Sequence, residues 1–189
     1  VFLNKMNKNI FRAYDIRGNS KTDLDQTTIT KIGYVLGERI KKNGHDSVYV
    51  GYDSRLSAKV IQSALVAGLN AAGIKVFLLG MVPTPMVYFA TKTGVTPNGV
   101  MITGSHNPKD DNGLKIVIND DAISGLELLS EVEKQADVLH VETNCEKINL
   151  FPQYQKEINQ KFILNKKIKI VLDAGNGACL LYTSDAADE

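Results

Sequence analysis

The sequence is poor in cysteine, lacks tryptophan and contains no long apolar run. Its two cysteines, Cys145 and Cys179, are too few to suggest a disulfide framework in a chain of 189 residues. No apolar run approaches the roughly 20 residues that a membrane-spanning helix needs, and residues 1–9 lack the apolar core of a signal peptide. These absences favour a cytoplasmic protein.

The chain also has almost no excess of charge. It carries 22 Lys and Arg residues against 21 Asp and Glu residues, which gives a formal net charge of +1. Nucleic acids and anionic membranes attract proteins with a strong positive excess, so neither is an expected partner. Small anionic ligands are compatible with this composition, because a local group of basic residues does not show in the total.

Common cofactor and metal motifs are absent as well. The sequence has neither a Gly-x-Gly-x-x-Gly fingerprint after an expected strand nor a phosphate-binding loop that ends in Gly-Lys-Ser/Thr. No serine lies in the Gly-x-Ser-x-Gly elbow of hydrolases. The histidines His45, His106 and His140 are scattered, which argues against a zinc site built from histidine and cysteine.

Short apolar runs alternate with helix-spaced apolar stripes through most of the chain. The runs expected to form strands cover residues 47–51, 75–79, 98–103 and 114–118, and a further short strand is expected within residues 10–18. The helices expected between them lie at about 26–42, 57–72, 86–92 and 125–137. Strands that alternate with helices predict a layered α/β sandwich.

The last fifty or so residues differ from this pattern. Residues 139–149 are polar and irregular, so we place a domain boundary there and assign residues 1–149 to a first domain. A helix is expected at residues 151–163 and a buried strand at 167–172, which together indicate that residues 150–178 start a second α/β domain. Residues 179–189 are similar to an in-frame translation of a sequencing adapter, and we expect them to be non-native; the alternative is a genuine amphipathic tail.

The most informative stretch is residues 103–108, which connect two apolar strand runs. Gly104 allows a close backbone turn, and Pro108 removes a donor and biases Asn107 away from helical conformation. Ser105 is therefore expected on a stiff loop, with His106 next to it and Lys115 following after a turn at residues 110–113. A serine next to a histidine is more often an ordinary surface residue in a turn than a functional group. The glycine and proline on either side of this pair make that ordinary interpretation less favoured here.

Basic residues are expected near this hydroxyl. Arg17 and Arg55 lie on other expected strand-end loops, and open α/β sheets bring such loops together at one edge. A hydroxyl surrounded by cations suits phosphoryl transfer, because the moving phosphoryl group spreads negative charge over its oxygens. The alternative for Arg12 and Arg17 is that both are solvated surface charges.

Five motifs, in the same order, resemble those of the α-D-phosphohexomutase superfamily, in particular its bacterial phosphomannomutase/phosphoglucomutase branch. They lie at residues 11–18, 51–57, 80–85, 103–115 and 173–177. The likeness covers residues 10–178. It implies that the first domain is a three-layer αβα sandwich with a mixed sheet, followed by the truncated start of a second α/β domain.

The resemblance also implies roles for individual residues. Ser105 matches the serine that carries phosphate, and His106 and Lys115 match residues with proton-transfer and charge-stabilising roles. Arg17 matches a catalytic residue near the transferred phosphate. For Asn107 we expect a role in shaping the loop through bonds to nearby backbone.

Substrate and metal binding follow from the same resemblance. Tyr14 and Arg12 are expected to bind substrate. In the family, Mg²⁺ binds the phosphoserine together with an Asp-Gly-Asp-Gly-Asp-Arg loop of the second domain, and this sequence does not contain that loop. The phosphate on Ser105 is thus the metal ligand expected from this chain.

The expected function is a phosphohexomutase that interconverts the 1- and 6-phosphates of mannose or glucose through a bisphosphorylated sugar. Phosphoglucosamine mutase is an alternative, although members of that branch tend to carry Ala where Gly104 stands. A non-catalytic fragment that binds phosphate is a second alternative. Because the sugar-reading loop and the phosphate clamp of later domains are missing, we expect the chain to be inactive alone.

Overall fold

The strands of the protein form one mixed sheet. A computed structural model describes residues 6–138, 143–163, 166–171, 173–175 and 177–178. Its strands are β1 (Ile16–Asn19), β2 (Ser47–Tyr52), β3 (Lys75–Met81), β4 (Gly99–Ile102), β5 (Asp111–Ile118), β6 (Asp121–Ile123) and β7 (Cys145–Lys147). The order is β1-β5-β4-β2-β3-β7, and β6 pairs with β5. Strands β4, β2, β3 and β7 are parallel, whereas β5 is antiparallel to both β4 and β1.

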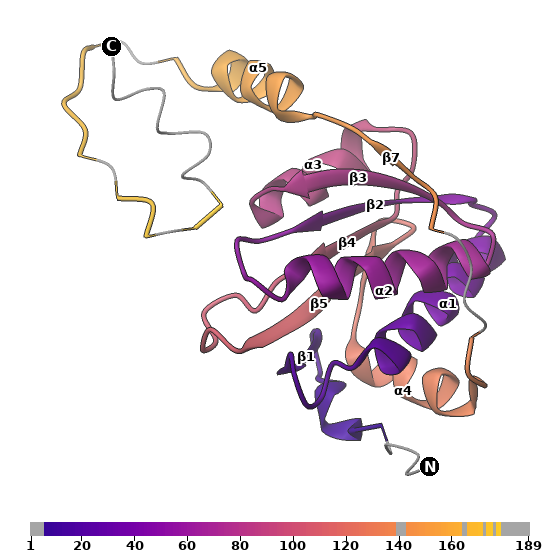
Figure 1. The fold of residues 1–189 in the computed structure, drawn as a ribbon. Helices are drawn as coiled ribbons and strands as arrows, with labels where there is room; N and C mark the ends of the chain where they lie inside the picture. Colours follow the sequence, from indigo (N-terminus) through magenta and orange to yellow (C-terminus); the bar gives the residue numbers. More distant parts are fainter. Residues whose placement is uncertain (1–5, 139–142, 164–165, 172, 176, 179–189) are drawn as a thin grey trace.

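Helices cover both faces of this sheet (Figure 1). On one face lie α1 (Gln26–Lys42), α2 (Ala58–Ala71) and α4 (Gly125–Lys134), and on the other lies α3 (Thr84–Thr93). A short 3₁₀ helix, η1 (Lys8–Ile10), precedes β1, and α5 (Phe151–Lys161) follows β7. The predicted three-layer αβα sandwich with a mixed sheet is therefore confirmed.

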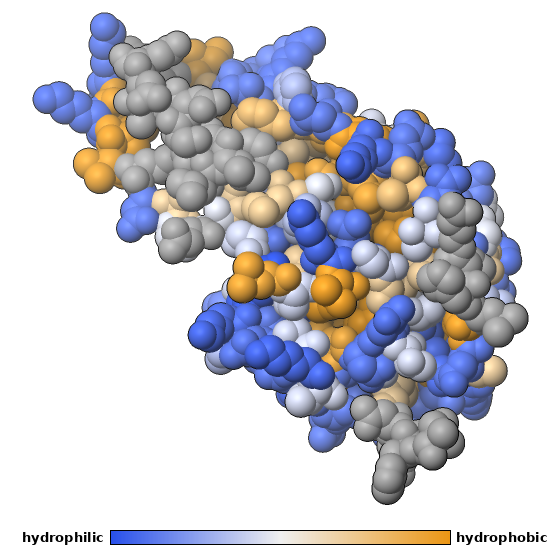
Figure 2. All heavy atoms as spheres, in the orientation of Figure 1, coloured by the Kyte–Doolittle hydropathy of each residue, from blue (hydrophilic) through white to orange (hydrophobic). Residues whose placement is uncertain are grey.

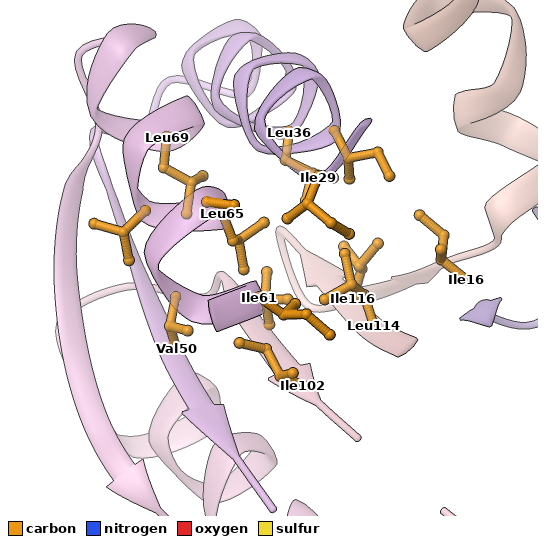
Figure 3. Close-up of a cluster of buried hydrophobic side chains, with 14 of the residues drawn as sticks. Ile16, Ile29, Leu36, Val50, Ile61, Leu65, Leu69, Ile102, Leu114 and Ile116 are labelled. Atoms are coloured by element: carbon orange, nitrogen blue, oxygen red, sulfur yellow. The ribbon is translucent and has the colours of Figure 1, made fainter. Parts of the chain in front are cut away.

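Two apolar cores join the layers. The larger lies between the sheet and helices α1, α2 and α4, and Figure 3 shows its isoleucine, leucine and valine side chains meeting between the helices and the strands. In the smaller core, Met86 and Val87 of α3 pack on Tyr49 of β2 and Phe77 of β3. A fully buried Leu or Ile side chain contributes roughly 1.5–3 kcal/mol. The two cores thus fix the sheet, and with it the loops at the strand ends.

Helices α1 and α2 cross at a backbone-to-backbone contact. A Cβ added at Gly68 of α2 would lie 2.1 Å from the carbonyl oxygen of Thr30 and 2.9 Å from the Cα of Gly33. A Cβ added at Gly33 would in turn lie 2.4 Å from the carbonyl oxygen of Leu65. Two glycines therefore let the helices approach more closely than any other residue would allow.

Helix α4 begins with a capping box. The Ser124 hydroxyl accepts from the N–H of Glu127, and the Glu127 carboxylate accepts from the N–H of Ser124. Hydrogen bonds from the side chain and the backbone of Ser124 lower the pKa of Glu127. Because folding lowers this pKa, the carboxylate stabilises the fold above its ordinary pKa, and that contribution is lost as the pH falls through the lowered value.

Replacing Ser124 with Ala is therefore expected to reduce the free energy of unfolding by about 1 kcal/mol, because the N–H of Glu127 loses its acceptor at the helix N-terminus. Urea unfolding at pH 7 measures this loss. Ser63→Ala, in the exposed middle of α2, is a control that removes a hydroxyl without removing a cap. An equal loss in both variants would contradict the capping role.

Three sequence predictions about local structure were wrong, and one strand was missed. The turn expected at residues 110–113 is largely the start of β5, because Asn112 and Gly113 pair with β1. The stretch at 139–149, expected to be irregular, contains β7, whose pairing with β3 extends the sheet. Strand β6 was not foreseen. At 167–171, residues expected to form a buried strand form none, and Val171 is fully exposed; no strand pairs with this stretch in the described part of the chain.

Helix α5 confirms the helix expected at 151–163, and it packs on α3 rather than standing free. The rings of Phe89 and Tyr154 meet edge to face with centroids 5.2 Å apart, and Phe151 lies against the smaller core. None of the helices within the described ranges has the length and apolar character needed to cross a bilayer. The adapter-like tail expected at 179–189 lies outside the described residues.

Candidate active site

The loops that follow β2 and β4 meet at the carboxyl-terminal edge of the parallel strands, as the sequence predicts. Strands β2 and β4 are neighbours, and the N–H of Asp53, just after β2, donates to the carbonyl of Ile102 at the end of β4 (3.0 Å). Thr103, next along the chain, donates its N–H to the carbonyl of Gly113 in β5 (3.0 Å). The loop at 103–108 is thus anchored between β2 and β5.

Ser105 lies exposed on this loop in an unusual backbone conformation. Its φ of +54° is in the left-handed region, which serine rarely adopts. Its N–H donates to the hydroxyl of Thr103 (2.9 Å), and its own hydroxyl lies 3.3 Å from Nδ1 of the exposed His106. The pairing of hydroxyl and imidazole expected from the sequence is therefore present.

Arg55 does not play the part that the sequence suggested. We expected its charge to face the Ser105 hydroxyl, but its guanidinium donates to the backbone carbonyls of Ser105 (3.1 Å), Asn107 (2.7 Å), Pro108 and Asp111 (2.8 Å). Its Nε also lies 3.4 Å from a carboxylate oxygen of Asp53. The cation is thus bound to the loop's backbone, on a side chain that is only 13% exposed.

A second group of charges lies where β1 and β5 run side by side. Arg17 Nη2 donates to the buried Asp15 carboxylate (2.6 Å), and Lys115 Nζ lies 3.7 Å from the same oxygen. Arg17 Nη1 donates to the side-chain oxygen of Asn107 (2.7 Å). Arg17 belongs to β1 itself and not to a loop, which corrects its expected place. Two cations share one carboxylate here, so the group is positively charged overall.

Two cavities open beside the loop. One of about 540 Å³ is lined by the second charge group and by the exposed residues Arg12 and Tyr14. A larger one of about 990 Å³ includes Ser105 in its lining. Asn107 lines both, so it joins the hydroxyl's cavity to the cavity of Arg17 and Lys115.

The larger cavity has an apolar wall. Val82 and Met101 line it, as do Leu56, which is fully exposed, and Val60, which is 70% exposed. Figure 2 shows apolar surface on the face of the molecule around the amino-terminal end of α2, where these two exposed residues lie. Ser105 therefore lies between a largely apolar surface and a cationic one.

Three residues with a place in this site were missed by sequence reasoning. Asp15 and Asp53 each precede an arginine by two residues and pair with it, so the repeated Asp-x-Arg spacing was a usable signal. Asn112 is completely buried and donates to the hydroxyl of Ser57 (2.8 Å); no sequence signal distinguished it. Asn107 was expected to bond nearby backbone, but its side chain bonds Arg17 and Asp111.

The metal predicted from the sequence finds no complete site within the described ranges. No group of three or more His, Cys, Asp or Glu side chains there is arranged to hold an ion. The cavity that includes Ser105 is lined by two carboxylates, those of Asp53 and Asp110, fewer than the oxygen ligands that Mg²⁺ needs. The described residues thus do not by themselves fit Mg²⁺, and a phosphate on Ser105 is the one ligand that the sequence assigned to this chain.

The chain is similar in sequence to a known family and to several known proteins. The model of the phosphoglucomutase/phosphomannomutase alpha/beta/alpha domain I matches residues 8–139. A phosphomannomutase/phosphoglucomutase of Pseudomonas putida is 41% identical over 171 residues, which are 89% of this chain and 37% of the relative. A phosphoglucomutase of Neisseria meningitidis is 37% identical over 90% of this chain and 38% of its own length.

A solved structure agrees with these relatives. A phosphoglucomutase/phosphomannomutase family protein from Burkholderia thailandensis superposes with a TM-score of 0.83 at 33% identity, over 95% of this chain and 42% of that one. The chain therefore spans less than half the length of the proteins that it matches. With most of its described residues covered by the domain I model, the chain belongs to the phosphoglucomutase/phosphomannomutase family.

Proposed function

We propose that Ser105 carries the phosphate of a phosphohexomutase that interconverts the 1- and 6-phosphates of mannose or glucose. The observation that supports this most is the placement of one exposed hydroxyl, held in a left-handed backbone, between two cavities joined by Asn107. Arg17 and Lys115 give one of these cavities the positive charge that a phosphate needs.

The proposed reaction consists of two phosphoryl transfers, the first from Ser105 to the sugar and the second from the sugar back to Ser105. A sugar hydroxyl attacks the phosphorus on Ser105, the bond from phosphorus to the serine oxygen breaks, and a bisphosphorylated sugar forms. The attacking hydroxyl releases its proton to solvent, and His106, whose Nδ1 lies 3.3 Å from the serine oxygen, supplies the proton that this oxygen takes up. In the second transfer the serine oxygen attacks the other phosphate of the sugar, so the phosphoserine is restored and the isomeric monophosphate leaves.

Substrate binding is proposed for Tyr14 and Arg12. Both side chains are exposed and line the cavity of Arg17 and Lys115, and Tyr14 is 87% exposed, so neither is used by the protein core. An exposed guanidinium and a phenol are suited to hydrogen bonds with sugar hydroxyls and phosphate oxygens. Hexose phosphates and the bisphosphorylated intermediate are the proposed ligands.

One observation favours the mannose/glucose branch over phosphoglucosamine mutase. A Cβ added at Gly104 would lie 2.4 Å from the Cζ of Arg55, whose guanidinium is held by four carbonyls. An alanine at this position would therefore need the arginine to move. The packing of Arg55 against Gly104 thus favours glycine over alanine at this position, and glycine is the residue expected in the mannose/glucose branch.

The proposal includes the domain assignment made from the sequence. Residues 1–149 form domain I and residues 150–178 start a second domain, with the remaining functions supplied by regions that the relatives have beyond the match. Mg²⁺, bound in part by the Ser105 phosphate, and a cytoplasmic location are retained as proposals. The 189-residue chain alone is then a phosphate-bearing domain without turnover.

The proposal can be tested on the chain as it stands by encoding phosphoserine at position 105. The second pKa of a phosphoserine is ordinarily about 6. We expect ³¹P titration to give a pKa lower by about half a unit or more, because Arg17 and Lys115 favour the dianion.

Arg17→Gln combined with Lys115→Gln should return the phosphate to its ordinary pKa. Lys41→Gln is the control, because Lys41 is an exposed lysine in the last turn of α1 that pairs with Glu38. An ordinary phosphate pKa in the otherwise unchanged chain would count against the proposed site.

A further inference from the structure

Arg55 gathers the carbonyls of the Ser105 loop around one guanidinium. Four carbonyl oxygens accept from it, those of Ser105, Asn107, Pro108 and Asp111. Arginine offers five N–H donors in a rigid planar fork, whereas lysine offers three donors on one nitrogen. This arrangement of acceptors therefore requires arginine and cannot be reproduced by an equal charge on lysine.

Asp53 completes the contact from the other side of the guanidinium. One of its carboxylate oxygens lies 3.4 Å from Arg55 Nε and accepts from the N–H of Gly104 (3.2 Å), while the other accepts from the N–H of Arg55 (3.1 Å). The Asp53 side chain is 19% exposed. Arg55 thus binds carbonyl oxygens of the loop, and Asp53 binds an N–H group of the same loop. We call this ion pair the Asp53–Arg55 clamp.

The clamp accounts for the backbone of Ser105. A serine with φ of +54° persists only where its surroundings over-determine the conformation. Here its carbonyl is held by Arg55, its N–H is held by Thr103, and the preceding Gly104 is held by Asp53. These three bonds act on Ser105 and on the residue before it, and together they hold the left-handed conformation.

The clamp also orders the peptide dipoles of the loop. The described peptide bonds are trans, so the N–H that follows a carbonyl points in the opposite direction. With the carbonyls of Ser105 and Pro108 directed at Arg55, the N–H groups of His106 and Lys109 point away from it. The negative ends of these dipoles are thereby turned toward the clamp and away from the other side of the loop.

We infer that Arg55, together with Asp53, is a positioning residue that sets the Ser105 hydroxyl, and the phosphate it carries, in place for transfer. Arg55 acts through the loop backbone and not by contact with the phosphate. This inference rests on the proposed function, because it gives the clamp a role in phosphoryl transfer that a loop without chemistry would not need.

The first measurement is amide hydrogen exchange in the full 189-residue chain. In Arg55→Lys and Arg55→Ala, the amides of Gly104, Asn107 and Asp111 are expected to exchange about tenfold faster or more, because the loop loses several bonds at once. Arg39→Ala is the matched control, since Arg39 also donates to a carboxylate and a backbone carbonyl but lies on α1. It should leave these three amides unchanged.

The second measurement separates positioning from folding. With phosphoserine at 105, Arg55→Lys should remove most of the lowering of the phosphate pKa, although the charge is kept and Arg17 and Lys115 are intact. Where Arg55→Ala fails to fold, Arg55→Lys and Asp53→Asn give the same two readouts in a milder form. Unchanged exchange in folded Arg55→Lys, or faster exchange with an unchanged phosphate pKa, overturns the inference.

These outcomes are distinct from failure of the proposed function. An ordinary phosphate pKa in the chain with Arg55 and Asp53 intact would show that the cationic cavity does not reach the phosphate. A lowered pKa that survives Arg55→Lys would instead leave the proposed function standing and remove the clamp's role.

Discussion

Replacing Ser105 with Ala is expected to lower hexose-phosphate turnover by about three orders of magnitude or more, because the phosphoserine that donates the phosphoryl group cannot form. The enzyme for this test is residues 1–178 joined to the remaining domains of the Pseudomonas putida relative, assayed by conversion of mannose or glucose 1-phosphate to the 6-phosphate. Thr103, the next hydroxyl along the loop, is buried and accepts from Ser105, so it cannot replace the missing group.

The matched control is Ser20→Ala. Ser20 lines the same cavity as Ser105 but belongs to the turn after β1, so its removal should leave turnover within a few-fold of the parent enzyme. Intact mass should find one phosphate on the parent enzyme after exposure to the bisphosphorylated sugar and none on Ser105→Ala. Turnover that survives Ser105→Ala within tenfold would rule out the phosphoserine as the carrier. The 189-residue chain, assayed alongside, should show none.

The sequence was sufficient to place the hydroxyl because local rules govern it. Gly104 and Pro108 bound a loop between two apolar strands, and the structure has that loop at a sheet edge where the loop after β2 meets it. Apolar residues at helical spacing likewise predicted α1, α2, α3 and α4 at nearly their observed bounds. These features, which depend on apolar spacing and on turn residues in the sequence, were therefore readable.

Side-chain direction was not readable in the same way. Spacing showed that Arg55 lies on a strand-end loop, but whether its guanidinium faces the Ser105 hydroxyl or the loop carbonyls depends on residues 50 and more positions away. Arg17 similarly meets Asn107 across 90 residues. Such contacts follow from the register of β1 on β5, which no local pattern specifies.

The sequence also failed to predict which segments near the end of the chain form strands. Strand β7 has only three residues, all of them exposed, so it has no apolar pattern, and it forms because β3 offers an unpaired edge. Residues 167–171 have the apolar pattern of a strand but no neighbouring strand in the described part of the chain, and they form none. Pairing partners, rather than composition, decided both cases.

Gly68→Ala is expected to lower the free energy of unfolding by about 3 kcal/mol. Helix propensity alone predicts the opposite sign, since Ala is favoured over Gly by up to about 1 kcal/mol in a helix. The new Cβ, however, would lie 2.1 Å from the carbonyl oxygen of Thr30 and 2.7 Å from the backbone nitrogen of Tyr34, and backbone atoms of a packed helix cannot rotate away. The helices must separate, which opens the larger core.

Thermal unfolding should show this as a melting temperature about 10 °C lower. Ser63→Ala makes a similar small change on the exposed side of α2 and should leave the melting temperature unchanged or slightly raised. A Gly68→Ala protein as stable as the parent would mean that α1 and α2 do not pack at this separation. Because α2 begins three residues after Arg55, an outward shift of α2 should also loosen the clamp, so the amide of Gly104 should exchange faster in Gly68→Ala and not in Ser63→Ala.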